Sequence, residues 1–115
     1  MTDGVTITAS LWRDFMPGAT DALIVAVTAT AAGDGVLPPG LRPDRVDIRY
    51  ADDVWSARLV EENPRSRTDR TFQAMARGGP RWPPGATVDV VVRLVGPDGA
   101  LAPLRVPDQR IMGVS

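Results

Sequence analysis

Residues 83–106 constrain the fold of this chain more than any other stretch. Within them Val88, Val90, Val92 and Leu94 recur at every second position. This period of two is typical of a β-strand with one face in the core. A Pro-Pro-Gly corner precedes the run, and a Gly-Pro-Asp-Gly turn signal follows it before a second hydrophobic run begins. The stretch therefore predicts a β-hairpin.

Five further stretches are predicted as strands from alternation or from a run of β-branched residues: residues 5–12, 21–32, 45–50, 54–60 and 71–77. The second is hydrophobic nearly throughout, so we expect a strand buried on both faces. The third and fourth are predicted to pair as a hairpin, and the Pro- and Gly-rich residues 32–44 are predicted as a loop. No stretch has the period of an amphipathic helix. We therefore expect one all-β domain, residues 1–115, built as a β-sandwich of about seven antiparallel strands.

The composition excludes several classes of site. The chain has no cysteine and no histidine. A disulfide framework, a thiolate zinc site, a cysteine nucleophile and a Ser-His-Asp triad are therefore impossible. An enzyme would have to rely on carboxylate, hydroxyl or arginine chemistry. We expect a protein that is not an enzyme and that uses no cofactor and no metal.

The charge and the termini bear on partners and compartment. The formal net charge is −1, which argues against a nucleic-acid binder held by phosphate contacts. No stretch approaches the ~20 apolar residues of a membrane span. The N-terminus shows no basic flank and no apolar run typical of a signal peptide, which favours the cytoplasm. All 13 basic residues are arginine, as codon bias in a GC-rich genome would produce; selection for bidentate anion contacts is the alternative.

Two segments resemble fibronectin type III domains. Residues 84–99, Pro-Gly-Ala-Thr-Val-Asp-Val-Val-Val-Arg-Leu-Val-Gly-Pro-Asp-Gly, resemble that family's F strand and F–G turn, and residues 45–50 are similar to its C strand. The chain departs from the family pattern at Val88, where the family has its corner tyrosine, and in residues 21–32, which lack the usual tryptophan. The resemblance implies an immunoglobulin-like or fibronectin III-like sandwich with a binding, spacer or scaffold role. It implies no chemistry.

Three tryptophans and an arginine-rich region are the candidate binding residues. Exposed indoles can stack on sugars or anchor a protein partner, whereas buried indoles would cover an end of the core. Between Trp55 and Trp82 there are six arginines against three acidic residues, so this region could dock an anionic ligand or an acidic partner. The alternative is that these arginines lie on solvated loops and strand faces. The residues expected to bind a partner are Trp12, Trp55, Trp82, Arg58, Arg77 and Arg81.

These observations favour a protein–protein interaction module, with self-association through exposed sheet edges as one possibility. A carbohydrate-binding module is the alternative, and it requires two indoles that are exposed and coplanar. The outer face of the 83–106 hairpin, formed by Thr87, Asp89, Val91 and Arg93, carries no recognisable chemistry. We therefore expect the site away from that hairpin, near Trp82 and the arginine-rich strands before it.

Overall fold

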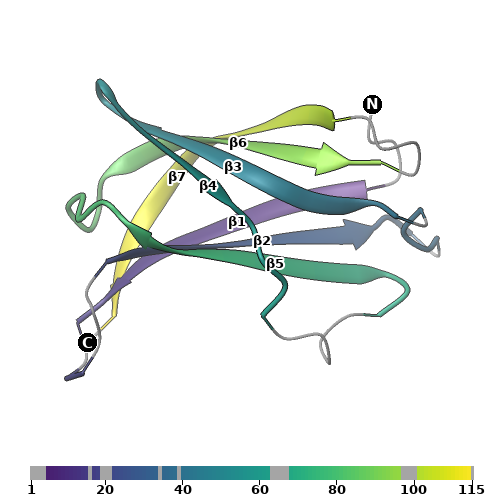
Figure 1. The fold of residues 1–115 in the computed structure, drawn as a ribbon, viewed down its shortest axis with the longest axis horizontal. Coiled ribbons are helices and arrows are strands. Elements are labelled where there is room, and N and C mark those ends of the chain that lie inside the picture. The colour runs from purple at the N-terminus through teal and green to yellow at the C-terminus, as the bar shows by residue number, and fades with distance from the viewer. Residues whose placement is uncertain are drawn as a thin grey trace.

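The computed structural model describes residues 5–15, 17–18, 22–33, 35–38, 40–62, 68–96 and 101–114. Within these ranges the chain forms strands and no helix, which confirms the all-β prediction (Figure 1). The strands are β1 (Val5–Asp14), β2 (Leu23–Ala31), β3 (Arg42–Tyr50), β4 (Asp53–Arg58), β5 (Thr71–Gly79), β6 (Thr87–Val95) and β7 (Leu101–Val114).

The strands form one seven-stranded sheet in the order β4-β3-β6-β7-β1-β2-β5. Strand β7 joins the two halves of this sheet, β4-β3-β6-β7 and β1-β2-β5. Its first part pairs with β6, and its end, from Ile111, pairs with β1. The β1–β7 pairing is parallel, so the prediction of antiparallel strands is wrong for this pair. The register between β6 and β7 shifts between Val88 and Val90, and Asp108 lies there with a left-handed φ of 59°. Beyond this bulge Gln109 and Arg110 still pair with β6, and Ile111 is the first residue of β7 to pair with β1.

The two edge strands of the sheet approach each other, so the sheet is nearly closed. Just beyond β4, the backbone N–H groups of Val60 and Met75 each donate to the other residue's carbonyl oxygen at 2.8 Å. Further along the seam, the ring of Trp55 on β4 lies against Gly79 on β5. The predicted strand 54–60 is therefore too long as a partner of β3, because its last residue has crossed to β5.

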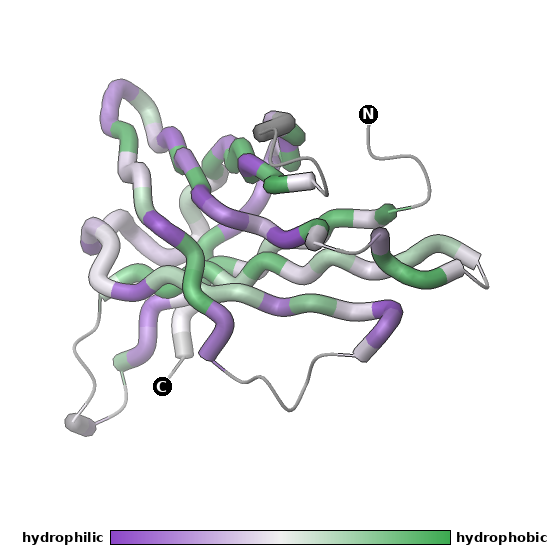
Figure 2. Tube along the Cα trace, turned by 45° about the vertical axis from the view of Figure 1, so that its right-hand side comes forward, coloured by the Kyte–Doolittle hydropathy of each residue, from purple (hydrophilic) through white to green (hydrophobic). Residues whose placement is uncertain are grey.

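The inward side chains of both halves form one hydrophobic core. Alternation along the strands places one residue in two inside, as predicted: Val46, Ile48, Val90 and Val92 are fully buried. Strand β2 is buried on both faces over its first five residues, which confirms the prediction for that run. Figure 2 shows hydrophilic residues gathered at the turn between β3 and β4.

Several predicted strand boundaries differ from those of the structure, and one predicted turn is untested. Strand β1 continues to Asp14, and β3 already begins at Arg42, inside the predicted loop, because a register shift between Pro43 and Arg45 accommodates the proline opposite β6. The Pro-Gly corner before β6 is a tight turn in which the Ala86 N–H donates to the Pro83 oxygen at 3.1 Å. The predicted turn at 96–99 lies largely outside the described residues.

Candidate functional site

The outer face of the β4-β3-β6-β7 half is hollowed. The hollow has a volume of about 650 Å³ and is open to solvent. Its polar and charged lining consists of outward-pointing residues that alternate with core residues: Asp47 and Arg49 on β3, Ser56 on β4, Asp89 and Arg93 on β6, and Arg105 on β7. The period of two that buries one face of these strands thus also builds a charged face on the other side.

Three arginines lie in a row across this face. The register places Arg45 of β3 directly opposite Arg58 of β4 on one side and Arg93 of β6 on the other. Side chains that are directly opposite on neighbouring strands have Cβ atoms about 5 Å apart, and like charges in that position are destabilising. The three neighbouring positive charges therefore repel one another on this face.

One arginine of the row is neutralised by Asp47. Its Oδ2 accepts a hydrogen bond from Nε of Arg93 at 3.0 Å. Burial alone would raise the pKa of Asp47, but hydrogen bonds from Ser56 and Arg93 and the positive charges of Arg93 and Arg45 outweigh it, so the pKa lies below its ordinary value. Asp47 is therefore a fixed negative charge in the middle of the face at neutral pH.

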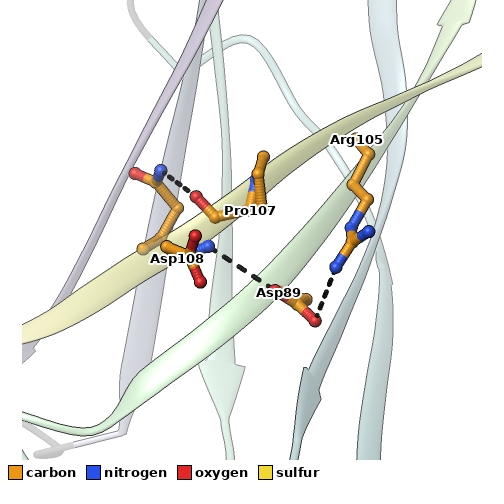
Figure 3. A network of polar contacts seen from close by, with 5 residues as sticks. Asp89, Arg105, Pro107 and Asp108 are labelled. Carbon is orange, nitrogen blue, oxygen red and sulfur yellow. Dashed lines mark hydrogen bonds and ion pairs between the residues drawn. The ribbon is translucent and has the colours of Figure 1, made fainter.

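A second carboxylate is held at the far side of the hollow, on β6 (Figure 3). Nη2 of Arg105 donates to Oδ2 of Asp89 at 3.2 Å, while Oδ1 of Asp89 lies 3.5 Å from the backbone N–H of Asp108. The Gln109 amide donates to the Pro107 oxygen at 2.9 Å in the same bend. Asp89 thus ties the outer face to the bulge in β7.

Three arginines on β3 and β4 keep their charge available, whereas Arg42 of β3 pairs with Asp44 at 3.8 Å. Arg45, Arg49 and Arg58 are exposed, and none of them makes an ion pair within the part of the chain that the structure describes. Arg49 lies between Val54 on β4 and Asp89 on β6, whose carboxylate is engaged by Arg105. An exposed guanidinium can donate two parallel hydrogen bonds to a carboxylate, so this side of the hollow can bind anionic groups.

The structure does not bring the three tryptophans together. Trp82 is buried, with 6% of its surface exposed, and its ring centroid lies 5.5 Å from that of Tyr50. The Trp82 backbone oxygen accepts a hydrogen bond from the buried Arg13 at 3.2 Å. This residue therefore belongs to the core, as the alternative interpretation of the tryptophans stated.

The other two indoles point to different sides of the sheet. Trp55 is half-buried, pairs with the core residue Ile48 and packs inward on Gly79. Trp12 is half-buried on the outer face of the other half, between Ile24 and the exposed Met112. No two of these rings form a coplanar exposed pair, which is the arrangement that a carbohydrate platform requires.

The candidate arginines also separate. Arg58 lies in the row described above, whereas Arg77 lies on β5 in the opposite half and pairs with Glu62 through contacts of 2.8–2.9 Å. That pair, with burial opposing it, lowers the pKa of Glu62 and raises that of Arg77. Arg81 is exposed in the segment after β5. Of the other arginines in the 55–82 region, Arg70 donates to the backbone oxygens of Ala31 and Gly33, and residues 65 and 67 lie outside the described residues.

Sequence reasoning missed the contribution of Arg45, Arg49, Arg93 and Arg105. It expected the site away from the 83–106 hairpin, yet the hollow lies partly on that hairpin's outer face. The available signal was that Arg45, Arg49 and Arg93 occupy the outward positions of predicted strands. The missing information was the register that brings residues 45, 58 and 93 side by side.

Comparison with protein-family models, with curated proteins and with solved structures finds no match for this chain. Within the described ranges no helix is long and apolar enough to cross a membrane. The same residues contain no group of three or more acidic side chains that could hold a metal ion.

Proposed function

We propose that this chain is a non-enzymatic protein-binding module with an immunoglobulin-like or fibronectin III-like β-sandwich fold, and that the outer face of β4-β3-β6-β7 is its binding surface. The strand order supports the fold. In immunoglobulin-like domains, counted in chain order, the first, second and fifth strands lie in one sheet and the third, sixth and seventh lie in the other. Some members add a strand beside the third. Strands β1-β2-β5 and β4-β3-β6-β7 are adjacent here in the same way.

The row formed by Arg58, Arg45 and Arg93 carries the functional proposal. Direct neighbours of like charge lower stability, and only Arg93 has a carboxylate partner among the described residues. A partner that supplies the missing negative charges would relieve this repulsion on binding. A second copy of the chain is a poor partner for this face, because the two arginine rows would repel each other.

Affinity capture with matched charge reversals tests the proposal. The wild-type chain, Arg45→Glu and Arg58→Glu are compared with Arg77→Glu, which makes the same charge change on the opposite half. We expect a protein partner that binds saturably when both components are purified, that is retained by Arg77→Glu, and that is lost with Arg45→Glu and Arg58→Glu. Equal retention by all variants would contradict this surface, and the lack of any saturable protein partner would contradict the function.

A further inference from the structure

The outer face of β3 carries a fixed pattern of charge along its length. Arg45, Asp47 and Arg49 point outward at every second position, so the sequence of charges is positive, negative, positive. A β-strand rises about 3.3 Å per residue, which separates the two arginines by about 13 Å. Arg58 lies beside Arg45 and strengthens that end.

The middle of this pattern does not attract anions. Asp47 is ionised at neutral pH, and its direct neighbours on this face are Ser56 and Val91, which carry no charge. Because Asp47 and Arg93 neutralise each other through their ion pair, a negative group above Asp47 gains no net attraction, whereas an uncharged side chain can rest on Val91 and Ser56. The face therefore offers two positions for carboxylates with an uncharged position between them.

The ends of the pattern limit the length of a partner. Beyond Arg49 the chain turns through Ala51 and Asp52 to Asp53, and both of these acidic residues are exposed. A third carboxylate continuing past Arg49 would meet this negative turn. At the other end of β3, Arg42 is paired with Asp44 at 3.8 Å, so the available charges run from Arg45 to Arg49 and the complementary ligand has one carboxylate for each.

Resting on the proposed function, we infer that the face binds an extended acidic segment of a protein partner, in which two carboxylates stand four residues apart and the residue midway is uncharged. In an extended segment, residues i, i+2 and i+4 point to the same side and rise at the same rate as β3. One carboxylate accepts hydrogen bonds from Arg45 and Arg58, and the other accepts hydrogen bonds from Arg49. A nucleic-acid strand matches this pattern poorly, because its backbone carries a charge at every repeat and places one opposite Asp47.

Short peptides test the spacing directly by fluorescence anisotropy. The probe is a labelled, capped peptide of threonine and valine with Glu at its third and seventh positions. The matched control has the same two Glu residues at the third and fifth positions, and a neutral control has Gln at the third and seventh. We expect the first peptide to bind about two- to fivefold more tightly than the second, as one exposed charge pair allows. Binding should weaken as salt rises from about 50 to 200 mM.

Variants assign the effect to the face. Arg49→Gln and Arg58→Gln are each expected to lower the affinity for the first peptide about two- to fivefold, whereas Arg77→Gln should leave that affinity unchanged. Asp47→Asn is the sharpest variant, because it removes the central negative charge and frees Arg93, so that the more closely spaced peptide should bind as well as the first one. Native amide chemical shifts of each variant establish that it is folded.

Equal binding of the two Glu peptides to the wild-type chain, or no binding at millimolar concentration, would overturn the inference. A single-stranded oligonucleotide that binds more tightly than the first peptide would also overturn it. If a protein partner is nevertheless captured and is lost with Arg45→Glu, the proposed function stands and only the acidic-segment inference fails. If neither peptides nor partner bind, both fail.

Discussion

The indole ring of Trp55 on β4 lies directly against the backbone of Gly79 on β5. A Cβ atom at residue 79 would lie 2.6 Å from Cζ3 of the ring, which is closer than any ordinary contact. These residues belong to the two edge strands of the sheet, and Val60 and Met75 pair along the same seam. A backbone pair and an aromatic ring therefore help to close the sheet along this seam, and the ring requires the smallest residue beneath it.

Gly79→Ala is expected to destabilise the chain. The added methyl group displaces Trp55, which packs against the core, so the free energy of unfolding should fall by about 1–3 kcal/mol. Urea unfolding followed by circular dichroism measures the change. An unchanged midpoint would show that the seam is not closed by this contact.

Gly113→Ala is the matched control for that substitution. At residue 113 the new Cβ would lie 3.5 Å from Phe15 and Pro84, an ordinary van der Waals distance, so the free energy of unfolding should change by less than about 0.5 kcal/mol. In a Trp55→Leu background, Gly79→Ala should cost less than in the wild-type chain, because the smaller side chain leaves room for the methyl group.

Ala51→Gly is expected to stabilise the turn between β3 and β4. Ala51 has a left-handed φ of 52°, which costs a residue with a Cβ atom about 1 kcal/mol or more, whereas glycine adopts this region freely. The greater freedom of glycine in the unfolded chain offsets part of this gain, so thermal or urea unfolding should show a net gain of about 0.5–1 kcal/mol. Ala57→Gly, the same change within β4, should instead lower stability, because a strand interior gains nothing from glycine.

Much of the fold could be predicted because buried and exposed residues alternate along each strand, and this pattern can be recognised from neighbouring residues alone. The alternation of residues 5–12 predicted Ile7 and Leu11 inside, and the structure buries both. The β-branched run around Val25 predicted a strand with both faces covered, and that strand is central in its half of the sheet. These predictions depend only on neighbours in sequence.

The remaining features depend on contacts between distant residues. The transfer of Val60 to β5 and of Ile111 to β1 required knowledge of which strands meet. For Trp82, in a Pro-rich corner, the sequence left exposure and burial open; in the structure its ring lies against Tyr50 and its backbone oxygen accepts a hydrogen bond from Arg13 on β1. The arginine row, likewise, combines residues from three strands. Local pattern predicted that each arginine points outward, and only the register shows that they are neighbours.

Asp47 is expected to make stability depend on pH at the acid end. Its pKa in the folded chain lies below the ordinary value of 3.8, so the folded state favours the charged carboxylate. The contribution of the Asp47 charge to the free energy of unfolding is therefore complete above the pKa of the unfolded state, and it is lost as the pH falls through the pKa of the folded state. The difference in unfolding free energy between the wild-type chain and Asp47→Asn should stay constant at neutral pH and shrink below about pH 4.

The neighbouring arginines provide the control for this pH dependence. Arg93→Gln should raise the pKa of Asp47, because it removes both a hydrogen bond and a positive charge. Arg45→Gln should raise it less, because Arg45 acts only through its charge. Carboxyl ¹³C shifts followed through the titration measure both values. Arg77→Gln, in the other half of the sheet, should leave the pKa of Asp47 unchanged, and a shift there would contradict a local origin.

The three tryptophans should differ in their access to solvent. Trp82 is buried beside Tyr50, Trp55 faces inward over Gly79, and Trp12 lies on the outer face of β1 beside the exposed Met112. In variants that keep one tryptophan and replace the others with Phe, acrylamide should quench Trp12 most and Trp82 least, and Trp82 should emit at the shortest wavelength because its surroundings are apolar. Urea unfolding of each variant should confirm that it remains folded. Equal quenching of Trp12 and Trp82 would contradict this arrangement, and it would reopen the carbohydrate platform that requires two exposed indoles.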